Sequence, residues 1–205
     1  MTDDVKDRFG QRDYQLRKQL YDQAGSVKWG LFYTYKRNYV AAEWVGRFGW
    51  ALDIFIVFIG SILLYITTRE GTPDFALFRP FSALSPTDLA LIILIGSLLS
   101  SFYGPKLRSR DYYNAGQELQ ELTDEVDYFI CQRLTDPDVS IQDLQEEFNT
   151  LQDRRHRLNQ STPQLGGHWY RLMKWKDKYK KLVPWESVKD SSQPSFKEFV
   201  QDKTK

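Results

Sequence analysis

Histidine and cysteine, two residue types that often perform catalysis or bind metals, are sparse in this chain. It has two histidines, His156 and His168, and a single cysteine, Cys131. Neither histidine has a cysteine or an acidic residue at the spacing of metal ligands, and Cys131 lies in an amphipathic pattern that suits a buried structural thiol. No glycine-rich phosphate loop follows a strand pattern. The sequence therefore predicts no catalytic residue, no metal site and no cofactor, and we expect the protein not to be an enzyme.

One ionisable residue stands out, because Asp53 lies inside an otherwise apolar stretch. Residues 49–68 read GWALDIFIVFIGSILLYITT. An ionisable side chain within a membrane span generally faces a bundle interior or a water-filled cavity. A ring of such carboxylates around a symmetry axis favours cations. The chemistry that Asp53 offers is therefore the selection or gating of ions.

The elements that would position Asp53 are two apolar blocks. The mean hydropathy of the chain is -0.52, but this average combines the blocks at 48–68 and 84–103 with highly charged surroundings. Each block has close to the ~20 residues that cross a hydrocarbon core of ~30 Å. A dozen Leu, Ile, Phe and Val residues contribute roughly -0.3 to -0.6 kcal/mol each to insertion, against about +2.5 to +3.5 kcal/mol for one central Asp. Both blocks are therefore predicted to be membrane spans rather than core helices of a soluble bundle, which usually have a polar face.

The two blocks are predicted to form an antiparallel hairpin. Ser85 or Thr87 can cap the second helix, with Pro86 in its first turn, and a short irregular loop connects it to the first. Lysine and arginine are concentrated outside the hairpin, and the loop contains only Arg69 and Arg79. This asymmetry places both termini in the cytoplasm. We therefore expect a multi-pass protein of the cell inner (plasma) membrane.

Aligning the two spans brings a strip of glycine and serine residues on the second span to the level of Asp53. If Phe48 lies level with Tyr103, Asp53 lies near Leu98. Two interpretations remain open: the strip provides close helix packing, or it lines or gates a pore in a symmetric oligomer. The candidate residues for packing or pore lining are Asp53, Gly96, Ser97, Ser100, Ser101 and Gly104.

The regions outside the membrane are predicted to be cytosolic helices. A short amphipathic helix is expected at about 11–24, and a second from about Val27 leads into the first span, with a bend at Gly46 or Gly49. After the second span, apolar residues three and four apart predict an amphipathic helix that ends near 135–138. Ser140 then caps another helix, which completes a helical hairpin.

The C-terminal region combines basic and aromatic residues. It is interpreted either as a packed helix whose lysines extend outward or as a helix on the anionic inner leaflet, where each Lys or Arg contributes about 1 kcal/mol. From Ser187 onward the composition predicts a loosely ordered tail. The candidate membrane-surface residues are Trp169, Arg171, Lys174, Trp175, Lys178 and Lys181.

These patterns together predict an all-α protein: an antiparallel two-span transmembrane hairpin with extended cytosolic helices, assembled as a symmetric oligomer. Residues 1–47 form the N-terminal cytosolic helices and 48–104 the transmembrane hairpin. Residues 105–160 form the cytosolic helical hairpin, and 161–205 the basic aromatic segment with its flexible tail. The net charge of +1 argues against nucleic acid as a partner.

Two segments that flank the hairpin resemble a known family. Residues 35–43, YKRNYVAAE, and residues 110–119, RDYYNAGQEL, are similar to the helices that flank the spans in the SLATT family of two-transmembrane effector domains, which associate with SMODS and SLOG proteins. The similarity in layout covers about residues 11–160.

The resemblance implies a membrane effector of prokaryotic antiviral and conflict systems that oligomerises and forms an ion channel-like pore or disrupts the membrane. A nucleotide signal or a signalling or sensor protein partner is then expected to trigger it, since no sensor domain is apparent in the sequence. The alternative is a membrane-anchored scaffold whose cytosolic helices bind a partner, without pore activity. In both cases the lipid bilayer is a partner.

Overall fold

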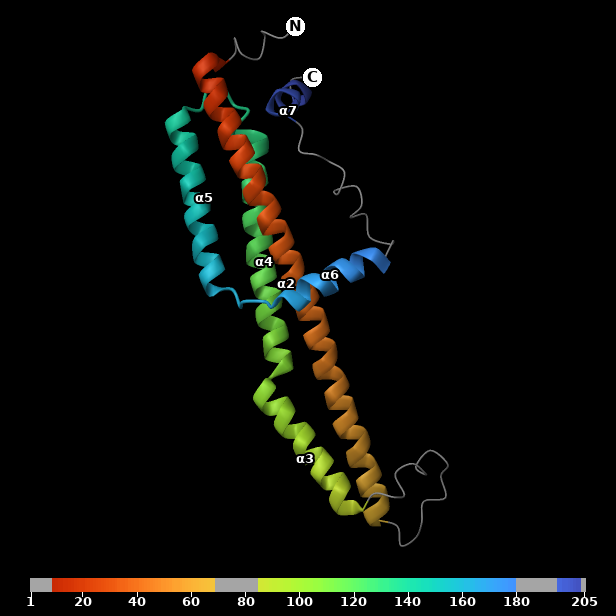
Figure 1. The fold of residues 1–205 in the computed structure, drawn as a ribbon. Coiled ribbons are helices and arrows are strands. Elements are labelled where there is room, and N and C mark those ends of the chain that lie inside the picture. Colours follow the sequence, from red (N-terminus) through yellow and green to blue (C-terminus); the bar gives the residue numbers. More distant parts are fainter. Residues whose placement is uncertain (1–8, 69–84, 180–194, 204–205) are drawn as a thin grey trace. The chain divides into compact units, whose positions relative to one another are not determined.

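A computed structural model describes residues 9–68, 85–179 and 195–203, and every regular element in these ranges is helical (Figure 1). The prediction of an all-α fold is confirmed. The predicted loop between the two apolar blocks lies outside the described residues. In chain order the elements are α2 (Gln11–Thr68), α3 (Pro86–Tyr103), α4 (Pro105–Tyr128), the π-helical turn η2 (Phe129–Arg133), α5 (Ile141–Ser161), α6 (Gly167–Tyr179) and α7 (Phe196–Lys203).

Helix α2 is one uninterrupted helix of 58 residues. The sequence predicted two helices in this range, with a bend at Gly46 or Gly49. Glycine weakens a helix by about 1 kcal/mol but keeps its backbone donor, whereas proline removes one, and α2 contains no proline. Its glycines therefore do not interrupt the backbone hydrogen bonds.

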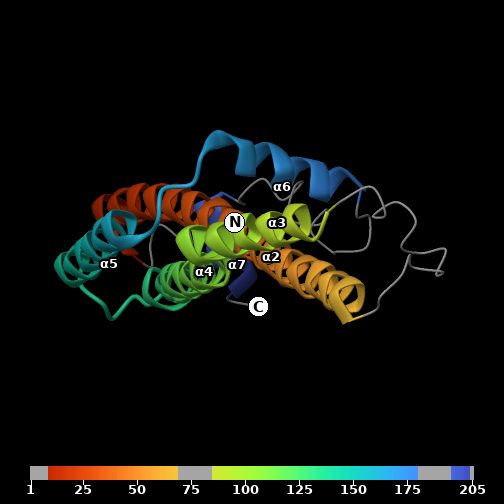
Figure 2. The same ribbon diagram turned by 90° about the horizontal axis from the view of Figure 1, so that it is seen from below.

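The chain divides into two compact units. The first combines residues 1–40 with 112–205, and the second consists of residues 41–111. Helices α2 and α4 contribute residues to both. In the first unit α2, α4 and α5 lie side by side (Figures 1 and 2). Their apolar faces form one core, which includes Leu31, Leu119, Leu122, Val126, Phe129, Leu134, Leu144 and Phe148. The amphipathic pattern after the second apolar block thus predicted the inward face correctly.

The predicted break at 135–138 follows η2, and the side chain of Arg17 from α2 is hydrogen-bonded to this part of the backbone. The Arg17 guanidinium is almost fully buried and donates hydrogen bonds to the carbonyl oxygens of Leu134 (2.9 Å), Asp136 (2.8 Å) and Val139 (2.5 Å). Burial lowers the pKa of this guanidinium, and the charges of Asp13 and Asp136 oppose that shift. Carbonyl groups released where η2 ends thereby find a donor inside the core.

The structure differs from the sequence prediction at the C-terminus. Within the segment predicted to be a loosely ordered tail, residues 196–203 form α7. Phe196 and Val200 are buried in the core of the first unit, and the Phe196 ring lies 5.6 Å from that of Tyr14 and 5.4 Å from that of Tyr21. Apolar residues at 196, 199 and 200 form a short amphipathic face, which the polar composition of the whole segment obscured.

The second unit contains the predicted hairpin, in which α2 and α3 run antiparallel (Figure 1). Ile59, Ile62 and Leu89 are buried between them. Helix α3 begins with a capping box: the Asp88 amide donates to Ser85 Oγ (3.2 Å), and the Ser85 amide donates to the Asp88 carboxylate (2.9 Å). Of the two predicted caps, Ser85 is therefore the one used.

Both helices of this hairpin are long and apolar enough to cross a membrane. Only 17% of the apolar window in α2 is buried, and 11% of the window in the helical stretch Pro86–Arg133. A core helix of a soluble protein would have most of its apolar residues covered. Large exposed apolar side chains include Ile54, Phe55, Val57, Phe58 and Leu64 on α2, and Leu91, Leu94, Ile95, Leu98 and Leu99 on α3.

Candidate functional site in the apolar hairpin

The candidate site lies where α3 ends and α4 begins. Gly104 separates the two helices in a left-handed conformation, with φ +52°, and its amide donates to the Ser100 carbonyl oxygen at 3.1 Å. Glycine adopts this conformation without a Cβ penalty, and Pro105 directly after it is compatible with a helix start. Gly104, a candidate for packing or pore lining, is therefore also the residue at which α3 ends.

Small residues let α2 approach this break closely. A Cβ at Gly49 would lie 3.0 and 3.2 Å from two carbons of the Pro105 ring, and one at Gly46 would lie 2.8 Å from Ser109 Oγ. Ser109 Oγ donates a hydrogen bond to the Ala42 carbonyl oxygen at 2.8 Å. Gly46 and Gly49, predicted as bends, are thus contact points. Gly96 is similarly close to α2, because a Cβ there would lie 3.1 Å from Ile56.

Asp53 lies at the edge of this contact and has two partners from the same chain. One carboxylate oxygen forms an ion pair with Lys106, and the other accepts a hydrogen bond from Ser100 Oγ at a long 3.5 Å. The Asp53 side chain is 37% exposed. The predicted proximity of Asp53 and Ser100 is therefore present in the structure. The sequence did not predict Lys106 as a partner, because aligning Phe48 with Tyr103 places Lys106 level with Val45, about two helical turns from Asp53.

The remaining predicted hydroxyls do not join this cluster. Ser97 and Ser101 are exposed on α3. On α2, Asp53 also borders an open groove of about 400 Å³ that runs along the helix. The groove is lined by Trp50, Asp53, Ile54, Val57, Phe58 and Ser61. Asp53 thus has a partner on one side and an open, largely apolar surface on the other.

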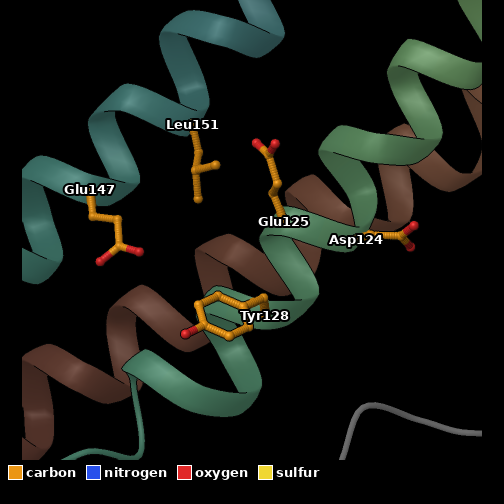
Figure 3. Close-up of a pocket in the computed structure, with 5 residues that line it drawn as sticks. All are labelled: Asp124, Glu125, Tyr128, Glu147 and Leu151. Atoms are coloured by element: carbon orange, nitrogen blue, oxygen red, sulfur yellow. The ribbon is translucent and has the colours of Figure 1, made fainter.

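A second groove, of about 360 Å³, lies in the first unit between α4 and α5 (Figure 3). Three of its five lining residues are acidic: Asp124, Glu125 and Glu147, together with Tyr128 and Leu151. Glu125 forms an ion pair with Arg154, and Glu147 pairs with Arg133 at 2.9 Å. The arginines thereby neutralise two of the carboxylates.

Asp124 is the acidic residue of this groove that points away from α5 (Figure 3). Together with burial, which is the larger cause, its charge raises the pKa of Tyr35. Within the described ranges no group of three His, Cys, Asp or Glu residues is placed to hold a metal ion. The groove therefore offers a contact surface on which acidic side chains predominate.

Helix α6 carries most of the predicted membrane-surface residues. Met173 is buried, while Arg171, Lys174 and Trp175 are exposed, and Trp169 is partly buried. The Lys174 ammonium lies 4.8 Å from the centre of the Tyr170 ring. One face of α6 is therefore packed and another is basic and aromatic. Lys178 lies in α6, but its side chain is outside the described atoms, and Lys181 lies outside the described residues.

Comparison of the chain with protein-family models, curated protein sequences and solved structures gives no match.

Proposed function

We propose that this protein is a membrane effector that spans the cell inner membrane through α2 and α3 and oligomerises to form a pore or to disrupt the bilayer. The observation that carries this proposal is the hairpin itself, whose apolar side chains are mostly exposed while Asp53 borders an open groove. Contiguous apolar patches beyond a few hundred Å² mark membrane or protein contacts, and burying apolar surface contributes about 25 cal/mol per Å². Hydrocarbon would cover most of this surface.

Asp53 supports the oligomeric part of the proposal. A carboxylate surrounded by lipid costs about 2.5 to 3.5 kcal/mol at the centre of a span, and Lys106 offsets part of this cost from one side only. A second copy against the groove on α2 would replace lipid with protein beside the carboxylate. Further copies around an axis would then bring several Asp53 residues to one level, where they could line or gate a cation path.

The resemblance to SLATT effectors supports a role in prokaryotic antiviral defence, with a nucleotide signal or a sensor protein as the trigger. A sensor partner would bind the helices of the first unit, and the groove between α4 and α5 is the candidate surface for it. The exposed basic and aromatic face of α6 would contact anionic lipid at the inner leaflet.

Ion flux tests the pore directly. We expect induced protein to depolarise cells, and Asp53→Leu to abolish this depolarisation at equal membrane abundance. Asp111→Leu is the matched control, because it removes an exposed carboxylate of the same unit that lies outside the apolar stretch. Purified, activated protein that gave no ion flux in liposomes, or that remained monomeric in nanodiscs, would exclude the pore.

The acidic groove favours one alternative, a membrane-anchored scaffold that binds a partner through the first unit and forms no pore. Replacing both spans with an unrelated hairpin distinguishes the two functions. A scaffold would retain its function after this replacement, and a pore-forming effector would lose it.

A further inference from the structure

The backbone between α3 and α4 is interrupted at a single residue. The Gly104 amide is bonded back to Ser100, and its carbonyl oxygen accepts the first bond of α4, from the Arg108 amide at 3.0 Å. Pro105 has no amide hydrogen to donate across the interruption. Each helix is therefore hydrogen-bonded up to Gly104, and Gly104 is the residue about which α3 and α4 can change their angle.

Asp53 contacts both sides of this interruption. Ser100, which reaches one carboxylate oxygen, lies in the last turn of α3, and Lys106, which pairs with the other, lies in the first turn of α4. Gly49, one turn earlier on α2, packs against Pro105 between them. A single side chain of α2 thus connects the end of one helix with the start of the next.

We propose that Asp53 is a clamp that fixes the angle between α3 and α4, and that the described arrangement, with the carboxylate neutralised by Lys106, is the resting form of the hairpin. Release of Lys106 lets α3 move relative to α4 about Gly104 and frees the carboxylate for the groove side of α2. This inference rests on the proposed function in one respect: the released form is taken as the active one. Only in that form would the Asp53 carboxylate, no longer paired with Lys106, face another copy of the chain.

The exposure of the two partners suits a contact that opens and closes. The Lys106 side chain is 70% exposed and that of Asp53 37%.

Distance measurements between spin labels on either side of Gly104 test the clamp. With Cys131 replaced by Ser, labels at Leu94 and Arg110, both exposed, lie sixteen residues apart (110 − 94 = 16). On an uninterrupted helix this separation spans about 24 Å. In nanodiscs we expect a narrow distance distribution for the otherwise unchanged chain, and a shifted, broader one for Asp53→Asn and for Lys106→Gln.

The double variant Asp53→Asn with Lys106→Gln should match the single variants, because all three remove the same contact. Arg47→Gln is the control, since it removes an ion pair with Glu43 that lies wholly within α2; it should leave the distances unchanged. Unchanged distances in Asp53→Asn and Lys106→Gln, or shifts that add in the double variant, would overturn the clamp.

Ion flux measured on the same variants in liposomes separates this inference from the pore. We expect Lys106→Gln to raise the flux without a trigger, since the pore carboxylate remains and the clamp is gone. Shifted distances without any flux would retain the clamp as a conformational contact and remove the pore. Flux through Lys106→Gln equal to that of the unaltered chain would overturn the resting-state assignment.

Discussion

At the scale of single residues, one buried side chain can provide the hydrogen bonds that several backbone carbonyls need. Arg17 is the clearest case outside the hairpin, because three backbone carbonyls depend on one guanidinium. The Phe9 ring lies 4.7 Å from the guanidinium carbon and covers it. The planar fork of arginine reaches several acceptors at once, which a lysine ammonium in the same place cannot reproduce.

Arg17→Met should therefore increase local unfolding of the segment after η2. The carbonyls of Leu134 and Asp136 lose a buried donor, at a cost of roughly 3 kcal/mol, which corresponds to about a 100-fold increase in local opening. Hydrogen exchange of residues 134–140 in nanodiscs measures this change. Arg12→Met, an exposed arginine on the same helix, should leave the exchange unchanged, and equal effects from both variants would contradict the role of Arg17.

At the scale of the elements, glycine has two distinct roles in α2. Gly49 allows Pro105 to approach, whereas the nearest atom to a Cβ at Gly60 would be an Ile93 methyl at 4.0 Å. We expect Gly49→Ala to destabilise the hairpin by about 1 to 3 kcal/mol through overpacking. Gly60→Ala should be neutral or stabilise it by up to about 1 kcal/mol, because alanine is the better helix former.

Thermal unfolding in detergent compares the two glycine variants. A change of 1 kcal/mol corresponds to roughly 2–4 °C in Tm for a chain of this size, so Gly49→Ala should unfold at a lower temperature and Gly60→Ala should not. If both variants unfolded at a lower temperature, the closer contact of Gly49 with Pro105 would not explain the effect of Gly49→Ala.

Helix α7 offers a second test at this scale. Phe196→Ala removes the ring between Tyr14 and Tyr21, and α7 should then detach from the core, because an eight-residue helix is marginal without packing. Faster hydrogen exchange in residues 196–203 would show this release. Lys197→Ala, a partly buried neighbour on the same helix, should leave α7 in place; exchange in Phe196→Ala as slow as in the unaltered chain would argue against docking through this ring.

How far these elements could be predicted depends on the range of the interactions. The spacing of apolar residues along a helix and the capping of its first turn both depend on residues close in sequence. The starts of α3 after Ser85 and of α5 after Ser140 could therefore be predicted from the sequence. The role of a glycine is not local: Gly46 and Gly49 look like bends until Ser109 and Pro105 are placed opposite them. The Asp53 to Lys106 contact was missed for the same reason, since it needs the break at Gly104 as well as the alignment of the spans.

At the scale of the whole molecule, membrane topology is the property that the proposed function requires. With Cys131 replaced by Ser, a cysteine at Thr72 between the two apolar blocks should react with a membrane-impermeant maleimide added outside intact inner-membrane spheroplasts. A cysteine at Lys205 should react only after permeabilisation. The reverse pattern would contradict the expected orientation, and labelling of both positions in intact spheroplasts would contradict a hairpin with cytoplasmic termini.

The internal hydrogen bonds of α2 bear on how the protein is made. Ser61 Oγ donates to the Val57 carbonyl oxygen, and Thr67 and Thr68 donate to Leu63 and Leu64 in the same way, so these hydroxyls need no partner outside the helix. The Asp53 carboxylate, in contrast, is bonded to Lys106 of α4 and Ser100 of α3. Because Lys106 is synthesised only after both apolar stretches, α2 would enter the bilayer with its acid uncompensated, and the hairpin would leave the translocation machinery as a pair rather than one helix at a time.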